Sequence, residues 1–295
     1  MNNKVYILDD RALIYISGED SKEFLQNLIS NDIKKVNERN SIFSSLFTPQ
    51  GKFLYEFIII KYQSGFFIDC EKSQQESLLN QLSIYKLRSK IQIQNLSDKF
   101  ILAALSYKKF MSFENVEDIE GFTINVDDDL FLLDPRNKKL GARLIIHSQK
   151  FFSLLKKKNL LISELRDYYR FSHELGIVPK NLNKLQNKLF GIECNYEELN
   201  GIDFKKGCYV GQENTARIKL KNKLSKRLLP VNLINGKLNI DDRIYHNEIE
   251  IGKVLIEDEY PFALIKYLDE NFNQKNEFKT KNAILKINQP DWIKI

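Results

Sequence analysis

The stretch Lys206-Gly207-Cys208-Tyr209-Val210-Gly211-Gln212-Glu213 decides which fold and which chemistry to expect of this 295-residue chain. The pattern after Val210 indicates a polar helix, with Cys208 at or just before its first turn. Free N–H groups at a helix start and the charge of Lys206 both lower the pKa of a thiol, so Cys208 is predicted to act as a nucleophile, redox thiol or metal ligand. The alternative is a buried, inert cysteine in a tight loop, since free cysteine is among the most buried residue types.

The cysteine content limits the metal and disulfide chemistry that the chain can perform alone. There are three cysteines, Cys70, Cys194 and Cys208, and no two form a Cys-x-x-Cys pair. An odd, sparse set argues against a disulfide scaffold. Zinc and iron–sulfur sites need about four ligands, usually in close pairs, and the three histidines are scattered. We therefore expect no metal site built from this chain alone.

The composition is that of a soluble globular protein with a core. Hydrophobic residues make up 43% and charged residues 28% of a chain long enough for two domains. The longest apolar runs, such as Phe57 to Ile60, are too short to span a bilayer, so no membrane partner is expected. The start lacks the pattern of a secretory signal or an Arg-rich transit peptide, which predicts a cytoplasmic protein. The net charge of +6 fits a solvated lysine surface or an anionic partner.

Short strands grouped in hairpins, with helices between them, are predicted over most of the chain. The turn-forming Thr48-Pro49-Gln50-Gly51 joins two of these strands. A helix pair is predicted at 151–155 and 162–175, and Gly176 is placed to end the second helix. Paired strands with intervening helices favour an α+β fold with layers of split-βαβ type.

The last part of the chain has a different pattern. Val231-Asn232-Leu233-Ile234 followed by Asn235-Gly236 is the strongest short hairpin signal in the sequence. Short strands continue to Trp292, and no strong helix signal appears after Arg227. Residues 228–295 are therefore predicted to form a small all-β unit, a barrel.

The motif at residues 206–213, with Arg217 four residues on, resembles the KGCYxGQE…R signature of the YgfZ-type folate-binding family. Further segments resemble that family in the same order along the chain. They are Phe24-Leu25-Gln26-Asn27 with Asn31-Asp32, Thr48-Pro49-Gln50-Gly51-Lys52, Arg170 with Gly176-Ile177, Glu193, Lys226-Arg227-Leu228 and Pro290-Asp291-Trp292.

This resemblance implies a fold like that of the aminomethyltransferase, or T-protein, of the glycine cleavage system. Residues 1–227 would form a T-protein-like folate-binding domain of ferredoxin-like subdomains, and residues 228–295 the C-terminal β-barrel. Tetrahydrofolate, or a derivative, would bind in a central opening. The implied function is to help assemble or repair iron–sulfur clusters, together with carrier or client proteins.

The resemblance also assigns the site residues. Cys208 would be the working thiol, and Lys206 would raise its thiolate fraction. Glu193 would accept two N–H bonds from the pterin, although a surface glutamate is the alternative. The other implied cofactor-binding residues are Gln26, Asp32, Arg170, Tyr209 and Gln212. Two of these have simpler readings, because Asp32 could cap a turn and Arg170 could pair with Glu174.

Two other functions stay open on the sequence. A folate-dependent aminomethyl transferase needs a general acid or base, and the carboxylate pair of the T-protein corresponds here to Tyr55 and Glu56, so Glu56 is the candidate. A tRNA-modification protein would use a basic run in which Tyr209 is the only aromatic residue. That run comprises Lys205, Lys206, Arg217, Lys219, Lys221, Lys223, Lys226 and Arg227.

Overall fold

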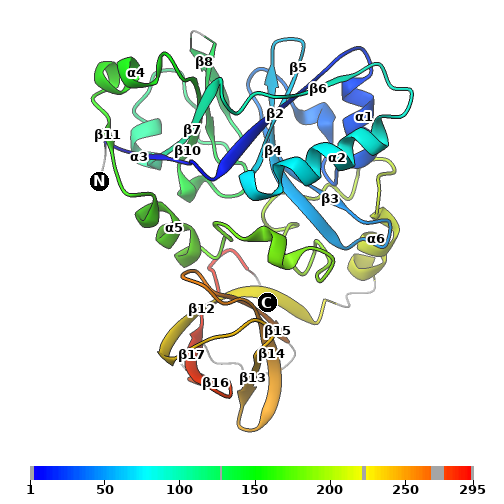
Figure 1. Cartoon of the computed structure of the whole chain (residues 1–295), viewed down its shortest axis with the longest axis vertical. Helices are drawn as coiled ribbons and strands as arrows, with labels where there is room; N and C mark the ends of the chain where they lie inside the picture. The colour runs from blue at the N-terminus through cyan, green and yellow to red at the C-terminus, as the bar shows by residue number, and fades with distance from the viewer. Residues whose placement is uncertain (1–2, 127, 221–223, 267–275, 294–295) are drawn as a thin grey trace.

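The structure is a computed structural model that describes residues 3–126, 128–220, 224–266 and 276–293. Two sheets lie side by side at one end of the longest axis, and a small barrel lies at the other end (Figure 1). The predicted α+β class with a barrel at the end of the chain is confirmed. None of the described helices is long and apolar enough to cross a membrane.

The first sheet is antiparallel and has five strands in the order β3-β4-β5-β2-β6. Helices α1 and α2 cover one of its faces, and their buried leucines share a core with alternate residues of β2 and β4. This alternation is what a strand with two buried faces requires. The elements are β2 (Arg11–Ser17), α1 (Ser21–Leu28), β3 (Ile42–Phe47), β4 (Phe53–Tyr62), β5 (Gly65–Glu71), α2 (Gln75–Lys86) and β6 (Gln92–Asn95).

The second sheet has six strands in the order β11-β1-β7-β10-β9-β8. Its outer face packs on α3 and α4 through Phe110, Phe151 and Leu155. The predicted helix at 162–175 begins later, because Leu161–Ile162 pairs with β1 as an edge strand. The elements are β1 (Lys4–Ile7), β7 (Phe100–Leu105), α3 (Tyr107–Phe110), β8 (Thr123–Val126), β9 (Asp129–Leu133), β10 (Ala142–His147), α4 (Phe151–Lys158), β11 (Leu161–Ile162) and α5 (Leu165–Glu174).

The largest hydrophobic core lies between the inner faces of the two sheets. It combines Leu13 and Phe67 of the first sheet with Leu132 and Ile145 of the second. The mostly irregular segment 177–209 adds its apolar side chains to the same core, which fixes that segment although it holds little secondary structure. It contains one short 3-10 helix (Leu182–Leu185) and the turns that lead into α6 (Gln212–Leu220).

The barrel is closed, with the strand order β12-β15-β14-β13-β16-β17 and its own core. It contacts the rest of the chain through α5, where the His173 Nε2 lies 3.0 Å from the Pro261 carbonyl oxygen. The Trp292 Nε1 donates to the Leu175 carbonyl at 2.8 Å. A domain division at residues 227 and 228 stays a prediction. The strands are β12 (Lys226–Gly236), β13 (Arg243–His246), β14 (Ile249–Ile256), β15 (Phe262–Lys266), β16 (Phe278–Lys279) and β17 (Ala283–Ile287).

Candidate functional site

Cys208 is the exposed thiol of this chain, whereas Cys70 and Cys194 are buried. Burial raises the pKa of Cys70 to about 12 and raises the pKa of Cys194 well above its ordinary value. Both buried thiols are therefore held in the protonated form, which is a poor nucleophile and metal ligand. Gly207, beside Cys208, is also exposed, and a Cβ at this glycine would meet nothing within 4 Å. The dipeptide Gly207-Cys208 thus stands open to solvent.

Lys206 points the other way, into the protein, and is only 6% exposed. Its Nζ donates to the main-chain carbonyl oxygens of Gln26, Ile29 and Asn31 at 2.8, 2.5 and 2.9 Å. Burial lowers the pKa of Lys206 to about 8, and the charge of Asp32 acts in the opposite direction. From the sequence, this ammonium was predicted to raise the thiolate fraction of Cys208. In the structure it lies in a cage of three main-chain carbonyl oxygens.

Tyr209, on the other side of Cys208, is also buried. Its ring lies 6.4 Å from the ring of Phe47 and 5.0 Å from the Lys206 Nζ, each measured to the ring centroid. Burial raises the pKa of Tyr209 to about 12. The exposed pair Gly207-Cys208 is therefore held between two residues, Lys206 and Tyr209, whose side chains are anchored inside the molecule.

Helix α6 begins at Gln212, so Cys208 precedes the helix by a short turn and does not lie in its first turn. Gly211 makes that turn with a φ of +84°, and a Cβ there would lie 2.5 Å from the Thr48 carbonyl oxygen. The Asn214 Nδ2 donates to the Gln50 carbonyl at 2.9 Å. The predicted turn at residues 48–51 therefore packs against the start of α6 and supports the cysteine loop.

Two predicted cofactor-binding residues lie near the carbonyl cage, but both are occupied by local bonds. The Gln26 Oε1 accepts from the Ile33 N–H at 3.0 Å. The Asp32 Oδ1 accepts from the Lys34 N–H at 3.0 Å and caps a short 3-10 helix, which is the simpler reading that the sequence left open.

The remaining predicted cofactor-binding residues are spread over the molecule. The Glu193 Oε2 accepts from the Phe190 N–H of its own loop at 2.8 Å. Half-buried Gln212 donates its main-chain N–H to the Tyr209 carbonyl at 3.2 Å. Arg170 is exposed and pairs with Asp167 at 2.9 Å, not with Glu174. Figure 1 shows α5, which carries Arg170, on the opposite side of the molecule from α6.

As a set, the residues predicted to bind tetrahydrofolate are not drawn together by either of two hollows in the described part of the chain. Two hollows lie near the cysteine loop, one of about 270 Å³ beside Asn31 and Asn200 and one of about 800 Å³ between α1 and the end of α2. None of the six predicted cofactor-binding residues lines either hollow. Close to the loop, aromatic rings fill the interior: a Cβ at Gly191 would lie 2.3 Å from the Phe47 ring.

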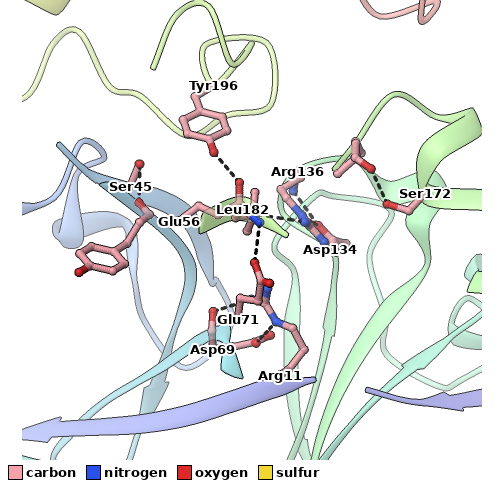
Figure 2. Close-up of polar contacts among 12 residues, drawn as sticks. Arg11, Ser45, Glu56, Asp69, Glu71, Asp134, Arg136, Ser172, Leu182 and Tyr196 are labelled. Carbon is pink, nitrogen blue, oxygen red and sulfur yellow. Dashed lines mark hydrogen bonds and ion pairs between the residues drawn. The ribbon is translucent and has the colours of Figure 1, made fainter. Parts of the chain in front are cut away.

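A chain of buried ion pairs joins the two sheets, and the sequence interpretation missed it (Figure 2). The Tyr196 hydroxyl donates to the Glu56 carboxylate at 2.6 Å, and burial raises the pKa of Glu56. The only signal was the presence of charged residues within apolar strands, which is rare unless the charges are paired. The pairs run Glu56–Arg136 at 3.6 Å, Arg136–Asp134 at 2.8 Å, Asp134–Arg143 at 3.5 Å, Arg143–Asp69 at 3.0 Å and Asp69–Arg11 at 2.7 Å.

This network decides what Glu56 can do. Its carboxylate is 5% exposed and already bound to Tyr196 and Arg136, so it offers no open acid or base to a substrate. Within the described ranges, no group of three or more His, Cys, Asp or Glu side chains could hold a metal ion. Of the candidates considered for catalysis, Glu56 is closed off, whereas the Cys208 thiol is exposed.

Comparison with known proteins identifies relatives of one kind. No model of a known protein family matches the chain. The chain is 29% identical over 236 residues to the mitochondrial iron–sulfur cluster assembly factor IBA57 homolog of Neurospora crassa, covering 76% of this chain and 52% of that protein. It is 28% identical to IBA57 of Mus musculus and 27% identical to that of Homo sapiens, covering 77% of this chain and 65% and 66% of those proteins. The chain thus spans about half to two thirds of these relatives.

These relatives correct one expectation. The sequence predicted a cytoplasmic protein, but the relatives are named as mitochondrial proteins. The cytoplasmic prediction is therefore wrong.

Among solved structures, the crystal structure of the glycine cleavage system aminomethyltransferase T from Bartonella henselae matches with a TM-score of 0.76. The match covers 99% of this chain and 86% of that chain at 13% sequence identity, and it shows that the two share a fold. Together, the sequence relatives and the shared fold support the family resemblance that the cysteine motif predicted: the chain is similar in sequence to IBA57 iron–sulfur cluster assembly factors and shares the fold of the T-protein aminomethyltransferase.

Proposed function

We propose that this protein is an assembly factor for iron–sulfur clusters in which Cys208 supplies a thiolate ligand to the cluster iron. The observation that carries the proposal is the exposure of Cys208 on a loop whose flanking residues, Lys206 and Tyr209, are buried. The names of the sequence relatives support the same function. Carrier or client proteins of such clusters are the expected partners.

The chemistry of the cluster explains why a partner is needed. An iron–sulfur cluster takes about four protein ligands, mostly thiolates. The described part of this chain offers no cluster of metal-binding side chains around Cys208. The other ligands would therefore come from the partner, and Cys208 would complete or protect the coordination during transfer. Binding to iron releases the thiol proton, because the thiolate is the ligand.

Cluster loading of the complex with a cluster carrier tests this proposal. The wild type, Cys208→Ala and Cys194→Ala are mixed with a loaded carrier, and the shared cluster is measured by visible absorption after gel filtration. We expect Cys208→Ala to lose the shared cluster, whereas Cys194→Ala keeps it because that thiol is buried. A Cys208→Ala protein that holds as much shared cluster as the wild type would remove the thiol from the mechanism.

Tetrahydrofolate, or a derivative, stays the cofactor predicted from the family resemblance alone. Since the predicted residues line neither of the two hollows described above, we derive no step through this cofactor. Titration of tetrahydrofolate against the wild type and Glu193→Ala tests the prediction. Selective loss of affinity in the variant would support a folate site at Glu193, and equal affinity would exclude this residue from the site.

Neither alternative function has an observation in its favour. An aminomethyl transferase would depend on Glu56, which is buried and engaged. For tRNA binding, three of the basic residues are already engaged within the protein: Lys206 is buried, Lys219 pairs with Glu197 and Arg227 pairs with Glu198. Lys221 and Lys223 lie outside the described residues.

A further inference from the structure

The end of α1 leaves carbonyl oxygens without their helical partners. In a continuing helix the Gln26 carbonyl would accept from the Ser30 N–H, but that N–H donates to the Ser45 carbonyl at 2.9 Å. The last carbonyls of a helix carry the negative end of its dipole, so a cation is favoured there. Lys206 supplies that cation from 180 residues away in sequence.

The ammonium of Lys206 is fully used in this position. A lysine ammonium has three donors, and three carbonyl oxygens within 2.9 Å accept them. The same side of the loop is fixed at a second point, because the Asp203 N–H donates to the Ser30 carbonyl at 3.0 Å and the Asp203 carboxylate pairs with Lys35 at 2.8 Å. The loop before Cys208 is therefore tied to the connection that follows α1.

Given the cluster function proposed above, we infer that Lys206 is a positioning residue, which ties the cysteine loop to the end of α1 so that Cys208 projects from the surface. It does not act by stabilising the thiolate. Its three donors face the carbonyl cage, and its side chain is buried while that of Cys208 is exposed. Loss of the tie would let Gly207 and Cys208 move, since glycine restricts the backbone least.

A matched pair of variants separates positioning from electrostatic activation. Lys206→Met and Lys205→Met each remove one positive charge next to the loop, but Lys205 is exposed and its side chain is not part of the carbonyl cage. Three quantities are measured: the rate of cluster transfer with a carrier, hydrogen exchange over residues 204–210, and the pH profile of Cys208 alkylation by iodoacetamide.

We expect Lys206→Met to slow cluster transfer at least about tenfold, in line with the loss that misplacing a reacting group by about 1 Å can cause. The variant also loses exchange protection over the loop, while the pH midpoint of alkylation matches that of Lys205→Met. A raised midpoint with unchanged exchange would overturn the inference in favour of electrostatic activation. Transfer at the wild-type rate would overturn it as well. The proposed function itself would fail on a different result: in the cluster-loading experiment, Cys208→Ala would keep the shared cluster.

A measurement on the wild type covers the case in which Lys206→Met fails to fold. Acetylation of Lys205 and Lys206 is compared by mass spectrometry in the folded protein. A caged ammonium requires Lys206 to react at least about tenfold more slowly than Lys205, because the amine must leave its hydrogen bonds to react. Equal rates for the two lysines would show that the cage does not hold the loop.

Discussion

At the scale of single residues, the buried ion pairs connect the two sheets across their shared core. Each arginine in the chain of ion pairs between the sheets contacts at least one carboxylate, so every charge of that chain has a partner of opposite sign. Removing one partner of a buried pair leaves the other uncompensated and costs about 3–5 kcal/mol. The ion chain therefore makes the contact between the two sheets sensitive to single substitutions.

Glu56 gives a sharp test of this sensitivity. We expect Glu56→Ala to lower the free energy of unfolding by about 1–3 kcal/mol, because the buried Tyr196 hydroxyl loses its acceptor, while Arg136 keeps Asp134 as its charge partner. Glu56→Gln should cost less, since its amide oxygen can still accept from Tyr196. Chemical denaturation measures both values. A Glu56→Ala protein as stable as the wild type would contradict the role given to the network.

Lys206 should make stability depend on pH in a defined direction. Burial lowers its pKa to about 8 in the folded protein, below the ordinary value of 10.5, so between these limits the unfolded chain binds more protons. The free energy of unfolding of the wild type, relative to Lys206→Met, should therefore rise as pH increases from about 8 toward 10.5. Denaturant unfolding at several pH values measures the difference, and a flat or falling difference would contradict the assignment.

At the scale of elements, the turn into α6 depends on one glycine and not on another in the same motif. Gly211 has a positive φ, and a Cβ there would lie within 3.0 Å of the Thr48 carbonyl oxygen and the Phe47 side chain. Gly207 has open space around it and no such φ. The close approach of the start of α6 to the turn at residues 48–51 therefore requires a glycine at position 211.

This contrast predicts opposite outcomes for two similar variants. Gly211→Ala should destabilise the protein by at least about 2 kcal/mol, because strain at a positive φ adds to the clash with the backbone. Gly207→Ala should change stability by less than about 1 kcal/mol, since nothing crowds the new methyl group. Thermal unfolding of the two proteins measures this. Equal melting temperatures would show that α6 does not pack as described.

At the scale of the whole molecule, the barrel is held to the sheets by α5 and by the end of the chain. His173 is buried on α5 against Pro261 and the ring of Phe262, whose centroid lies 5.2 Å from the imidazole. Trp292 packs against both the barrel core and the core between the sheets. Because His173 is buried at this junction, protonation of its imidazole should weaken the contact between the barrel and the sheets.

Acid should weaken this junction. Burial lowers the pKa of His173 below its ordinary value of 6.5, so just below pH 6.5 the unfolded chain binds more protons and stability falls as pH falls. The single tryptophan, Trp292, reports the junction by its fluorescence. Denaturant unfolding between pH 7 and 5 should lose less stability in His173→Gln than in the wild type. Equal losses would assign the pH dependence to other groups.

The sequence by itself determined what depends on neighbours along the chain. The turn at residues 48–51, the strands on either side of it and the barrel after Arg227 follow from local turn chemistry and periodicity. The resemblance of the cysteine motif pointed to the same fold, but left to the structure whether the thiol is exposed. Such features need only a few consecutive residues, because backbone preferences and burial patterns act over short distances.

Only the tertiary structure decided which distant residues meet. Lys206 finds its carbonyls 175 to 180 residues away, and β1 and β2 follow each other in sequence but join different sheets. Helix α5, which carries Arg170, lies on another side of the molecule from α6. The physical reason is that a buried charge needs hydrogen-bond or charge partners. Those partners come from whichever segments the packing brings within about 3 Å, however distant they are in sequence. That choice is made by the assembled core and is absent from any local stretch of the sequence.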